Sequence, residues 1–273
     1  MTKSDEYRTR LHTLNDWDLF LLKESGLPGP RGNLELAHVV ANEGSLPLFQ
    51  RYITYTIDKA PTNSPYEFLA FCGVVGLGRL LAEGDEGILT TLRTFASDSR
   101  WRIREAVAMA LQRLGEVDMR RLIAEMKEWS SGTPLEQRAA VAALCEPKLL
   151  GQAKHVKAVL QVLDRVTLSL EQSGDRKGED FLTLRKGLGY CWSVAVAALP
   201  IEGKKQMEKW LARSDKDVQW IMKENLKKQR LARMDAGWVK KWQGRISKAR
   251  GISATSDRAV GWRRDSSPLR GSE

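Results

Sequence analysis

Two tryptophans of the sequence are each followed four residues later by a glutamate, Trp101 by Glu105 and Trp220 by Glu224. On an α-helix this spacing places the indole and the carboxylate one turn apart on the same face. An indole face attracts a cation, and a carboxylate can stabilise positive charge that grows as a bond breaks. Tryptophans close to a helix start more commonly pack between helices, so each pair is either a binding surface or a packing feature.

The arginines beside the first pair have simpler roles open to them. Arg102 could form an ion pair with Glu105 on a solvated helix face. Arg104 is expected to bond a carboxylate of a neighbouring turn, such as that of Asp98. No complete set of catalytic groups is visible, so Glu105 is a catalytic candidate only if the protein is an enzyme. The candidate binding residues are Trp101, Arg102, Glu105, Trp220 and Glu224.

Cysteine and histidine, which are common metal ligands, occur only three times each. Cys72, Cys145 and Cys191 lie in apolar helical patterns, and no metal-ligand spacing joins them to the three histidines. An odd number of such cysteines argues against a disulfide framework and for a reducing compartment. The segment 73–78 is glycine-rich but lacks the Lys-Ser/Thr of a phosphate-binding loop. We therefore expect no metal and no cofactor, and a cytoplasmic location.

Charge is distributed unevenly along the chain. Thirteen lysines and arginines and four acidic residues lie in 227–273, which places nine of the ten net positive charges there. Basic residues interleaved with tryptophans can neutralise phosphates and stack on bases, although a solubilising tail would have the same composition. The nucleic-acid-binding candidates are Lys227, Lys228, Arg230, Arg233, Lys240, Lys241, Arg245 and Lys248.

Apolar residues recur at helical spacing along most of the chain, and no useful alternating strand pattern is present. Ser64-Pro65-Tyr66-Glu67 and Thr133-Pro134-Leu135-Glu136 repeat one helix start: an N-cap residue, a proline and a capping-box glutamate. Residues 97–99 should cap a helix that Gly115 ends. Beyond the start at Pro65, the pattern predicts helices over 16–23, 34–43, 46–58, 85–96, 101–114, 118–129, 135–144, 153–170, 179–199, 204–212, 218–231 and 235–247.

Taken in pairs, these helices make about six hairpins, and a single hairpin cannot bury its own apolar face. The last helix has an apolar ridge of Trp238, Trp242 and Ile246 and a basic opposite side, as the end of an array requires. We therefore predict an all-α protein, a right-handed α-solenoid with a C-terminal capping helix. Residues 1–15 would be an N-terminal extension, 16–250 the solenoid and 251–273 a disordered basic tail. Apolar runs are too short for a membrane span.

The segment SDSRWRIREAVAMALQRLG, from Ser97 to Gly115, resembles the HEAT repeat, and Ser214–Lys228 is similar to a looser copy. Among HEAT-like proteins, the closest functional resemblance is to the DNA alkylation repair glycosylases. That resemblance implies a concave basic groove in which tryptophans and a carboxylate surround a cationic alkylated base. Trp101, Glu105 and Trp220 would take these roles here, with glutamate at the position where aspartate is expected.

The preferred functional hypothesis is a non-catalytic HEAT-repeat scaffold that binds a protein or nucleic acid. Its concave row of inner-helix residues would form the binding surface, and the basic C-terminal region would attach it to nucleic acid. The alternative is a DNA glycosylase acting on alkylated bases, with Glu105 as the catalytic carboxylate. An adaptor that binds only protein is the third option.

Overall fold

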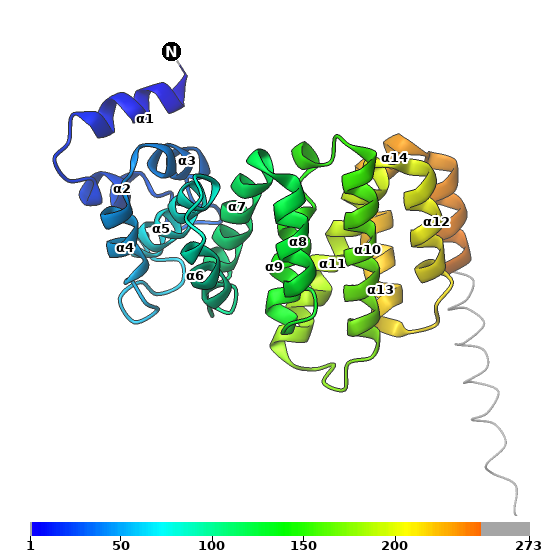
Figure 1. The fold of residues 1–273 in the computed structure, drawn as a ribbon. Helices are drawn as coiled ribbons and strands as arrows, with labels where there is room; N and C mark the ends of the chain where they lie inside the picture. Colours follow the sequence, from blue (N-terminus) through cyan, green and yellow to red (C-terminus); the bar gives the residue numbers. More distant parts are fainter. Residues whose placement is uncertain (1, 247–273) are drawn as a thin grey trace, which may run out of the picture.

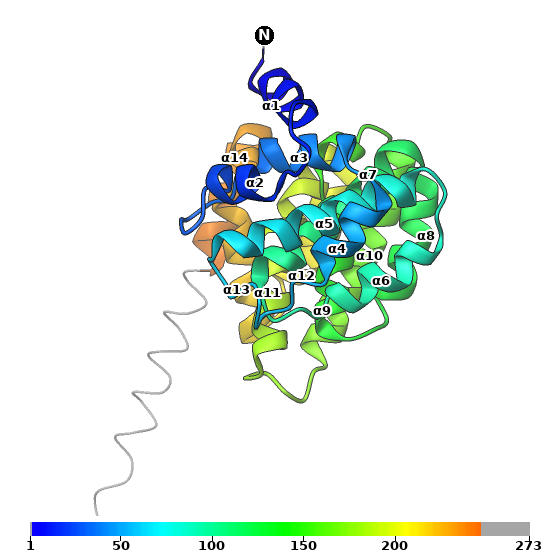
Figure 2. The same ribbon diagram turned by 90° about the vertical axis from the view of Figure 1, so that its left-hand side faces the viewer.

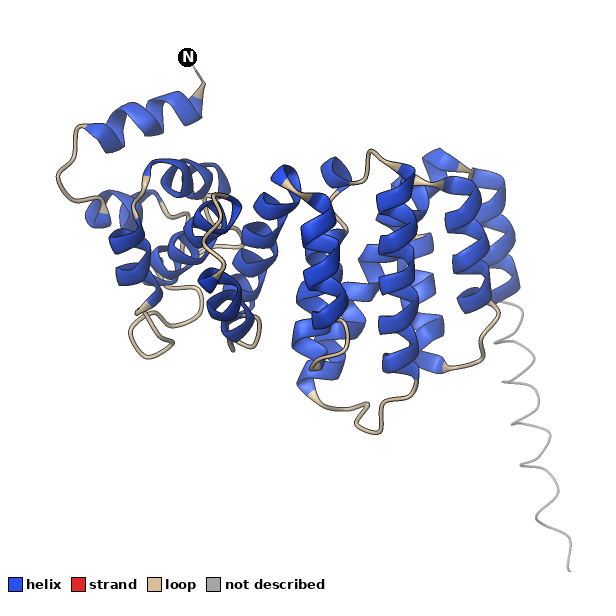
Figure 3. Cartoon of the chain, in the orientation of Figure 1, coloured by secondary structure: helices blue, strands red, loops and turns tan. Residues whose placement is uncertain are grey.

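The computed structural model describes residues 2–246. This part of the chain consists of helices joined by loops and contains no strand (Figure 3). The all-α prediction is therefore confirmed. Lys248 and the predicted tail over 251–273 lie outside the described residues.

The N-terminal half is built around one long helix, α5 (Pro65–Ala82), against which α2, α3, α4, α6 and α7 pack. Glycines allow the close approach. A Cβ on Gly76 would lie 2.3 Å from the Phe49 ring of α4, and one on Gly78 would lie 2.4 Å from the Ala110 backbone of α7. The other helices of this half are α1 (Lys3–His12), α2 (Asp18–Glu24), α3 (Leu34–Glu43), α4 (Leu46–Ile53) and α6 (Gly87–Phe95).

The C-terminal half forms two rows of helices (Figure 1). One row runs α7, α9, α11 and α13, and the other runs α8, α10 and α12, each helix packing on the next in its row. These helices are α7 (Trp101–Val117), α8 (Met119–Trp129), α9 (Pro134–Leu144), the 3-10 turn η1 (Pro147–Leu149), α10 (Ala153–Glu171), α11 (Glu179–Ala198), α12 (Pro200–Leu211), α13 (Lys216–Leu226) and α14 (Gln229–Met234).

The first row continues into the N-terminal half, because α5 packs along α7. Seen from the N-terminal side, α5 lies in front of the rows (Figure 2). One buried apolar core extends from Tyr7 to Ile246 and joins the two halves. The expectation that every apolar run is too short for a membrane span is wrong for α5, which is long and apolar enough. However, 72% of that stretch is buried inside the protein, which is the environment of a core helix.

The two predicted helix starts are present, and they differ in detail. Thr133 and Glu136 form a complete capping box, with the Thr133 N–H 2.8 Å from the glutamate. At α5, Ser64 accepts from the Glu67 N–H, but the Glu67 carboxylate accepts from the Asn63 N–H and is fully buried. The Glu67 carboxylate therefore does not close a capping box, and it pairs with Arg102 of α7.

The predicted start of α7 at residue 101 is confirmed, but its predicted cap and its predicted end at Gly115 are wrong. Its N-cap position is Arg100, which forms no side-chain cap, and the Asp98 carboxylate instead accepts from the Arg100 N–H and guanidinium. Gly115 lies inside α7, which runs on to Val117. A Cβ at this position would lie 2.7 Å from the Leu122 side chain of α8. The glycine thus allows Leu122 of α8 to pack closely and does not end the helix.

Other boundaries shift by smaller amounts. The expected helix over 46–58 ends at Ile53, α12 begins at Pro200 instead of residue 204, and the expected 218–231 helix is divided into α13 and α14. The segment 1–15, described above only as an extension, contains α1. The closing helix covers 236–246 of the described residues, and Trp238, Trp242 and Ile246 are buried as predicted.

Candidate functional site

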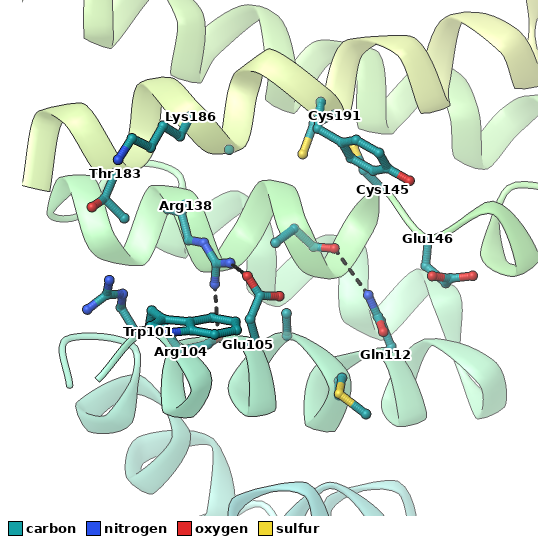
Figure 4. A pocket seen from close by; sticks show the side chains of 15 residues that line it. Trp101, Arg104, Glu105, Gln112, Arg138, Cys145, Glu146, Thr183, Lys186 and Cys191 are labelled. Atoms are coloured by element: carbon teal, nitrogen blue, oxygen red, sulfur yellow. Dashed lines mark hydrogen bonds and ion pairs between the residues drawn. The ribbon is translucent and has the colours of Figure 1, made fainter. Parts of the chain in front are cut away.

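A groove of about 560 Å³ runs between α7, α9 and α11. In Figure 4, α7 and α11 form its walls, and α9 lies between them. We call it the α7–α11 groove. Its lining is mixed: Trp101, Glu105 and Gln112 come from α7, Arg138 and Ala142 from α9, and Lys186 and Tyr190 from α11.

Trp101 lies at one end of the groove and is 47% exposed, although it is the first residue of a helix packed into the core. The Arg102 guanidinium lies 4.5 Å from the centre of its ring. Trp101 also lines a separate apolar pocket of about 370 Å³, whose other walls include Phe68 and Phe71. The indole is therefore a wall shared by two cavities and is accessible to a ligand.

Glu105 follows Trp101 on the same face of α7 and forms an ion pair with Arg138 of α9. The pair spans the groove floor, as Figure 4 shows, and Arg138 also donates to the Arg104 carbonyl oxygen at 2.9 Å. The expected pairing of Glu105 with Arg102 is absent. Because its partner neutralises much of its charge and fixes its position, Glu105 is a positioned carboxylate that remains 45% exposed.

Cations outnumber acids at this end of the groove. The Arg104 guanidinium donates to the backbone oxygens of Asp98 and Ser99 at 2.6 and 3.0 Å, and not to the Asp98 carboxylate as expected. Burial and the neighbouring Arg138 lower the pKa of Arg104, which still leaves it charged at neutral pH. Lys186 is exposed on the opposite wall and has no ion-pair partner among residues 2–246.

Arg102 does not belong to the open groove. Its side chain is 7% exposed and lies 3.1 Å from the fully buried Glu67 carboxylate. It also donates to the Gly29 carbonyl oxygen at 2.7 Å and to the Asn63 side chain at 3.1 Å. Arg102 therefore links α7 to the start of α5, and its guanidinium packs against the Trp101 ring.

The second tryptophan–glutamate pair lies elsewhere. Trp220 is partly buried against Gly189, on the side of α11 that meets α13, and the Arg185 guanidinium lies 4.6 Å from its ring centre. Glu224 pairs at 2.5 Å with Lys227, the residue directly after the end of its helix. Neither residue lines the α7–α11 groove. The structure thus brings Trp101 and Glu105 together and leaves Trp220 and Glu224 apart from them.

The basic candidates are distributed over α14 and its neighbours. Lys228 and Arg230 lie 5.6 and 4.7 Å from the ring centre of Tyr190, at the groove end opposite Trp101. Arg233 donates to Gln229, and the Arg245 guanidinium lies 5.0 Å from the Trp242 ring centre. The remaining described candidates, Lys240 and Lys241, are exposed on the closing helix.

Cys145 and Cys191 lie at the base of the groove (Figure 4). Burial raises the pKa of the Cys145 thiol well above its usual value, so this thiol is protonated at neutral pH and is a poor nucleophile. No group of three or more His, Cys, Asp or Glu side chains within residues 2–246 is placed to hold a metal ion.

Several groove residues were not predicted from the sequence, among them Arg138, Lys186 and Tyr190. Arg138 is the single charged residue in the otherwise small and apolar stretch Arg138–Leu144, and it follows Glu105 by about one repeat length. That isolated charge on an inner helix was the available indication. Lys186 and Tyr190 lie in a stretch that contains Gly187 and Gly189, and its sequence pattern gives no indication of a binding role.

Comparison with protein-family models, with curated proteins and with solved structures found no match to this chain.

Proposed function

We propose that the two helix rows form a right-handed HEAT-like solenoid of about six hairpins, and that the protein is a non-catalytic scaffold that binds nucleic acid in the α7–α11 groove. The observation that carries this proposal is the accessible Trp101 ring beside Arg104, Arg138 and Lys186, with Glu105 among them and Glu146 as the second carboxylate of the groove. An aromatic face with adjoining cations suits a base and its phosphate. The three free, buried cysteines agree with a cytoplasmic location.

The basic residues of α14 and of the closing helix would extend this surface. Lys228 and Arg230 meet the groove at Tyr190, so a bound strand could run from Trp101 to Tyr190 and on toward Lys240 and Lys241. Each phosphate that is neutralised releases counterions, and binding would therefore weaken steeply as salt is raised.

The test is fluorescence anisotropy with single-stranded and duplex DNA at low and moderate salt. Two double variants of the full chain separate the regions: Trp101→Ala with Lys186→Gln in the groove, and Lys240→Gln with Lys241→Gln on the closing helix. Full-length variants are preferable to truncation near Leu231, because truncation would remove the buried Trp238 and Trp242.

We expect the groove variant to lose at least tenfold in affinity and the closing-helix variant to lose about two- to fivefold, with a smaller salt slope. Equal affinity of the groove variant and the unaltered protein would refute binding in the groove. If neither nucleic acid binds at all, the protein-binding adaptor becomes the better hypothesis.

A second candidate function is a DNA glycosylase acting on alkylated bases. It is favoured by one observation, the Glu105 carboxylate held by Arg138 one turn from the exposed Trp101. Trp220, the third residue that this hypothesis needs, does not line the groove. Release of free base from methylated DNA, lost in Glu105→Gln, would establish the enzyme. Under the scaffold hypothesis neither protein releases any base.

A further inference from the structure

A second polar hollow lies beyond the groove, where the end of α7, the start of α8, η1 and the start of α10 meet. Its volume is about 530 Å³. Helix α7 lines the groove as far as Gln112 and lines this hollow from Gly115 onward, so the two sites are neighbours along one helix. The function proposed above assigns no role to it.

The start of α10 opens into this hollow. This helix is 19 residues long, and its N-cap residue, Gln152, makes no side-chain cap hydrogen bond. The first N–H groups of a helix have no partner within the helix, and the helix dipole adds partial positive charge at that end. An uncapped start of this kind favours an anion.

His155 provides an independent indication of a missing ligand. It lies in the first turn of α10, lines the hollow and is only 8% exposed. Its buried Nε2 atom has no hydrogen-bond partner in the described chain. A buried polar atom without a partner is costly, and a ligand oxygen in the hollow could supply that partner.

The charged groups around His155 favour an anion. Lys148 and Lys154 are exposed, as is Arg120 of α8, and none of the three forms an ion pair within residues 2–246. Of the two acids in the lining, Asp118 already accepts from two N–H groups at the start of α8 at 3.0 Å, and Glu116 is the other. Burial, together with Lys154 and Arg120, lowers the pKa of His155, and Asp118 opposes this effect.

We propose that this hollow binds a phosphate group through the first N–H groups of α10, the side chains of Arg120, Lys148 and Lys154, and Nε2 of His155. The source of the phosphate is either inorganic phosphate or a phosphodiester of a nucleic acid. The site does not depend on the groove, and it can be tested whether or not the groove binds nucleic acid.

The first experiment follows the His155 ring signals by NMR during pH titrations in phosphate and in chloride of equal ionic strength. A bound anion neutralises the nearby cations and accepts from the protonated ring, so about 10 mM phosphate should raise the pKa of His155 by roughly 0.5 to 1 unit, a three- to tenfold preference for the protonated form. His12 is the internal control, because it lies outside the hollow and pairs with Glu43.

Variants at the protein surface avoid loss of folding. Lys148→Gln with Lys154→Gln should abolish the response to phosphate, whereas Lys205→Gln, an exposed lysine of α12, should leave it unchanged. A His155 that does not respond to phosphate in the unaltered protein overturns the proposal. So does a response that survives in the double variant.

Duplex DNA in place of phosphate distinguishes the two sources. If DNA raises the pKa of His155 and inorganic phosphate competes with it, the ligand is a backbone phosphodiester. If inorganic phosphate alone acts, the ligand is a small phosphate. Unchanged DNA affinity in the groove variant, together with an intact phosphate response of His155, refutes only the function proposed above, so the two proposals can fail separately.

Discussion

Trp101 and Trp220 have the same spacing to a glutamate and different structural roles. Each begins or lies near the start of a helix of the first row, each has an arginine guanidinium about 4.5 Å from its ring centre, and each precedes a glutamate by one turn. Trp101 faces an open groove, and its glutamate pairs across to α9. Trp220 packs on α11, and its glutamate pairs with the residue that follows its own helix.

The neighbouring helix accounts for this difference. Gly189 of α11 has no side chain, so the Trp220 ring packs against the helix itself; a Cβ there would be 3.1 Å from the ring. On α9, the position facing Trp101 and Glu105 is occupied by Arg138, which binds the carboxylate and lines the groove between the helices. The same tryptophan–glutamate spacing therefore produces an open surface or a packing contact, according to which residue the neighbouring helix places opposite the tryptophan.

The arginines behind the two tryptophans should differ most. Arg102→Ala leaves the fully buried Glu67 carboxylate without its cation and should cost about 3–5 kcal/mol. Arg185→Ala leaves Asp217 paired with Arg176 at 3.2 Å, so about 1 kcal/mol is expected. Urea unfolding of both variants measures the two losses. Equal losses would mean that Glu67 does not depend on Arg102.

Replacement of the tryptophans themselves should separate stability from binding. Trp220→Ala removes a packed ring and should cost about 2 kcal/mol, whereas Trp101→Ala should cost less than about 1 kcal/mol. For nucleic-acid affinity the order should reverse, with a loss only in Trp101→Ala. Thermal unfolding and anisotropy on the same two samples make the comparison. A Trp101→Ala variant that is the less stable of the two would place that residue with the packing residues.

The two glutamates provide a milder contrast in affinity. Glu105→Gln removes one of the two carboxylates, the other being Glu146, from a groove that contains Arg104, Arg138 and Lys186, so nucleic acid should bind about three- to tenfold more tightly at low salt. Glu224→Gln changes a site outside the groove and should leave the affinity within about twofold. Anisotropy at two salt concentrations is the measurement. Weaker binding by Glu105→Gln would indicate that the carboxylate contacts the ligand directly.

The starts of α13 and α7, the helices that contain the two tryptophans, should differ in how their contribution to stability depends on pH. At α13, burial of Asp215 is outweighed by the Val218 N–H and the Arg176 guanidinium, which lower its pKa. A lowered pKa adds stability that is present above the unfolded value, near pH 4, and is lost as the pH falls through the folded value. Asp215→Asn should therefore remove up to about 1 kcal/mol at pH 7 and less near pH 3. At α7, whose start lacks a side-chain cap, Ser99→Ala should show no such trend.

Local patterns in the sequence were sufficient for the helices and part of the core. Apolar spacing predicted α3 to the residue, and the capping signals marked the starts of α5 and α9. The ridge of Trp238, Trp242 and Ile246 was predicted as the apolar face of the last helix and is buried. These features depend on residues within a turn or two of one another, so spacing and residue type determine them.

The candidate site was predicted only in part, because its composition depends on residues far apart in the chain. Glu105 meets Arg138 instead of Arg102, and Arg102 meets Glu67, 35 residues away. Gly115 permits packing inside α7 instead of ending it. A helical pattern determines which residues share a face, but the partners of that face come from other helices, whose approach depends on side-chain volume and buried charge. By itself the sequence determined the helices and the two tryptophan–glutamate pairs, and only the tertiary structure decided which pair faces an open groove.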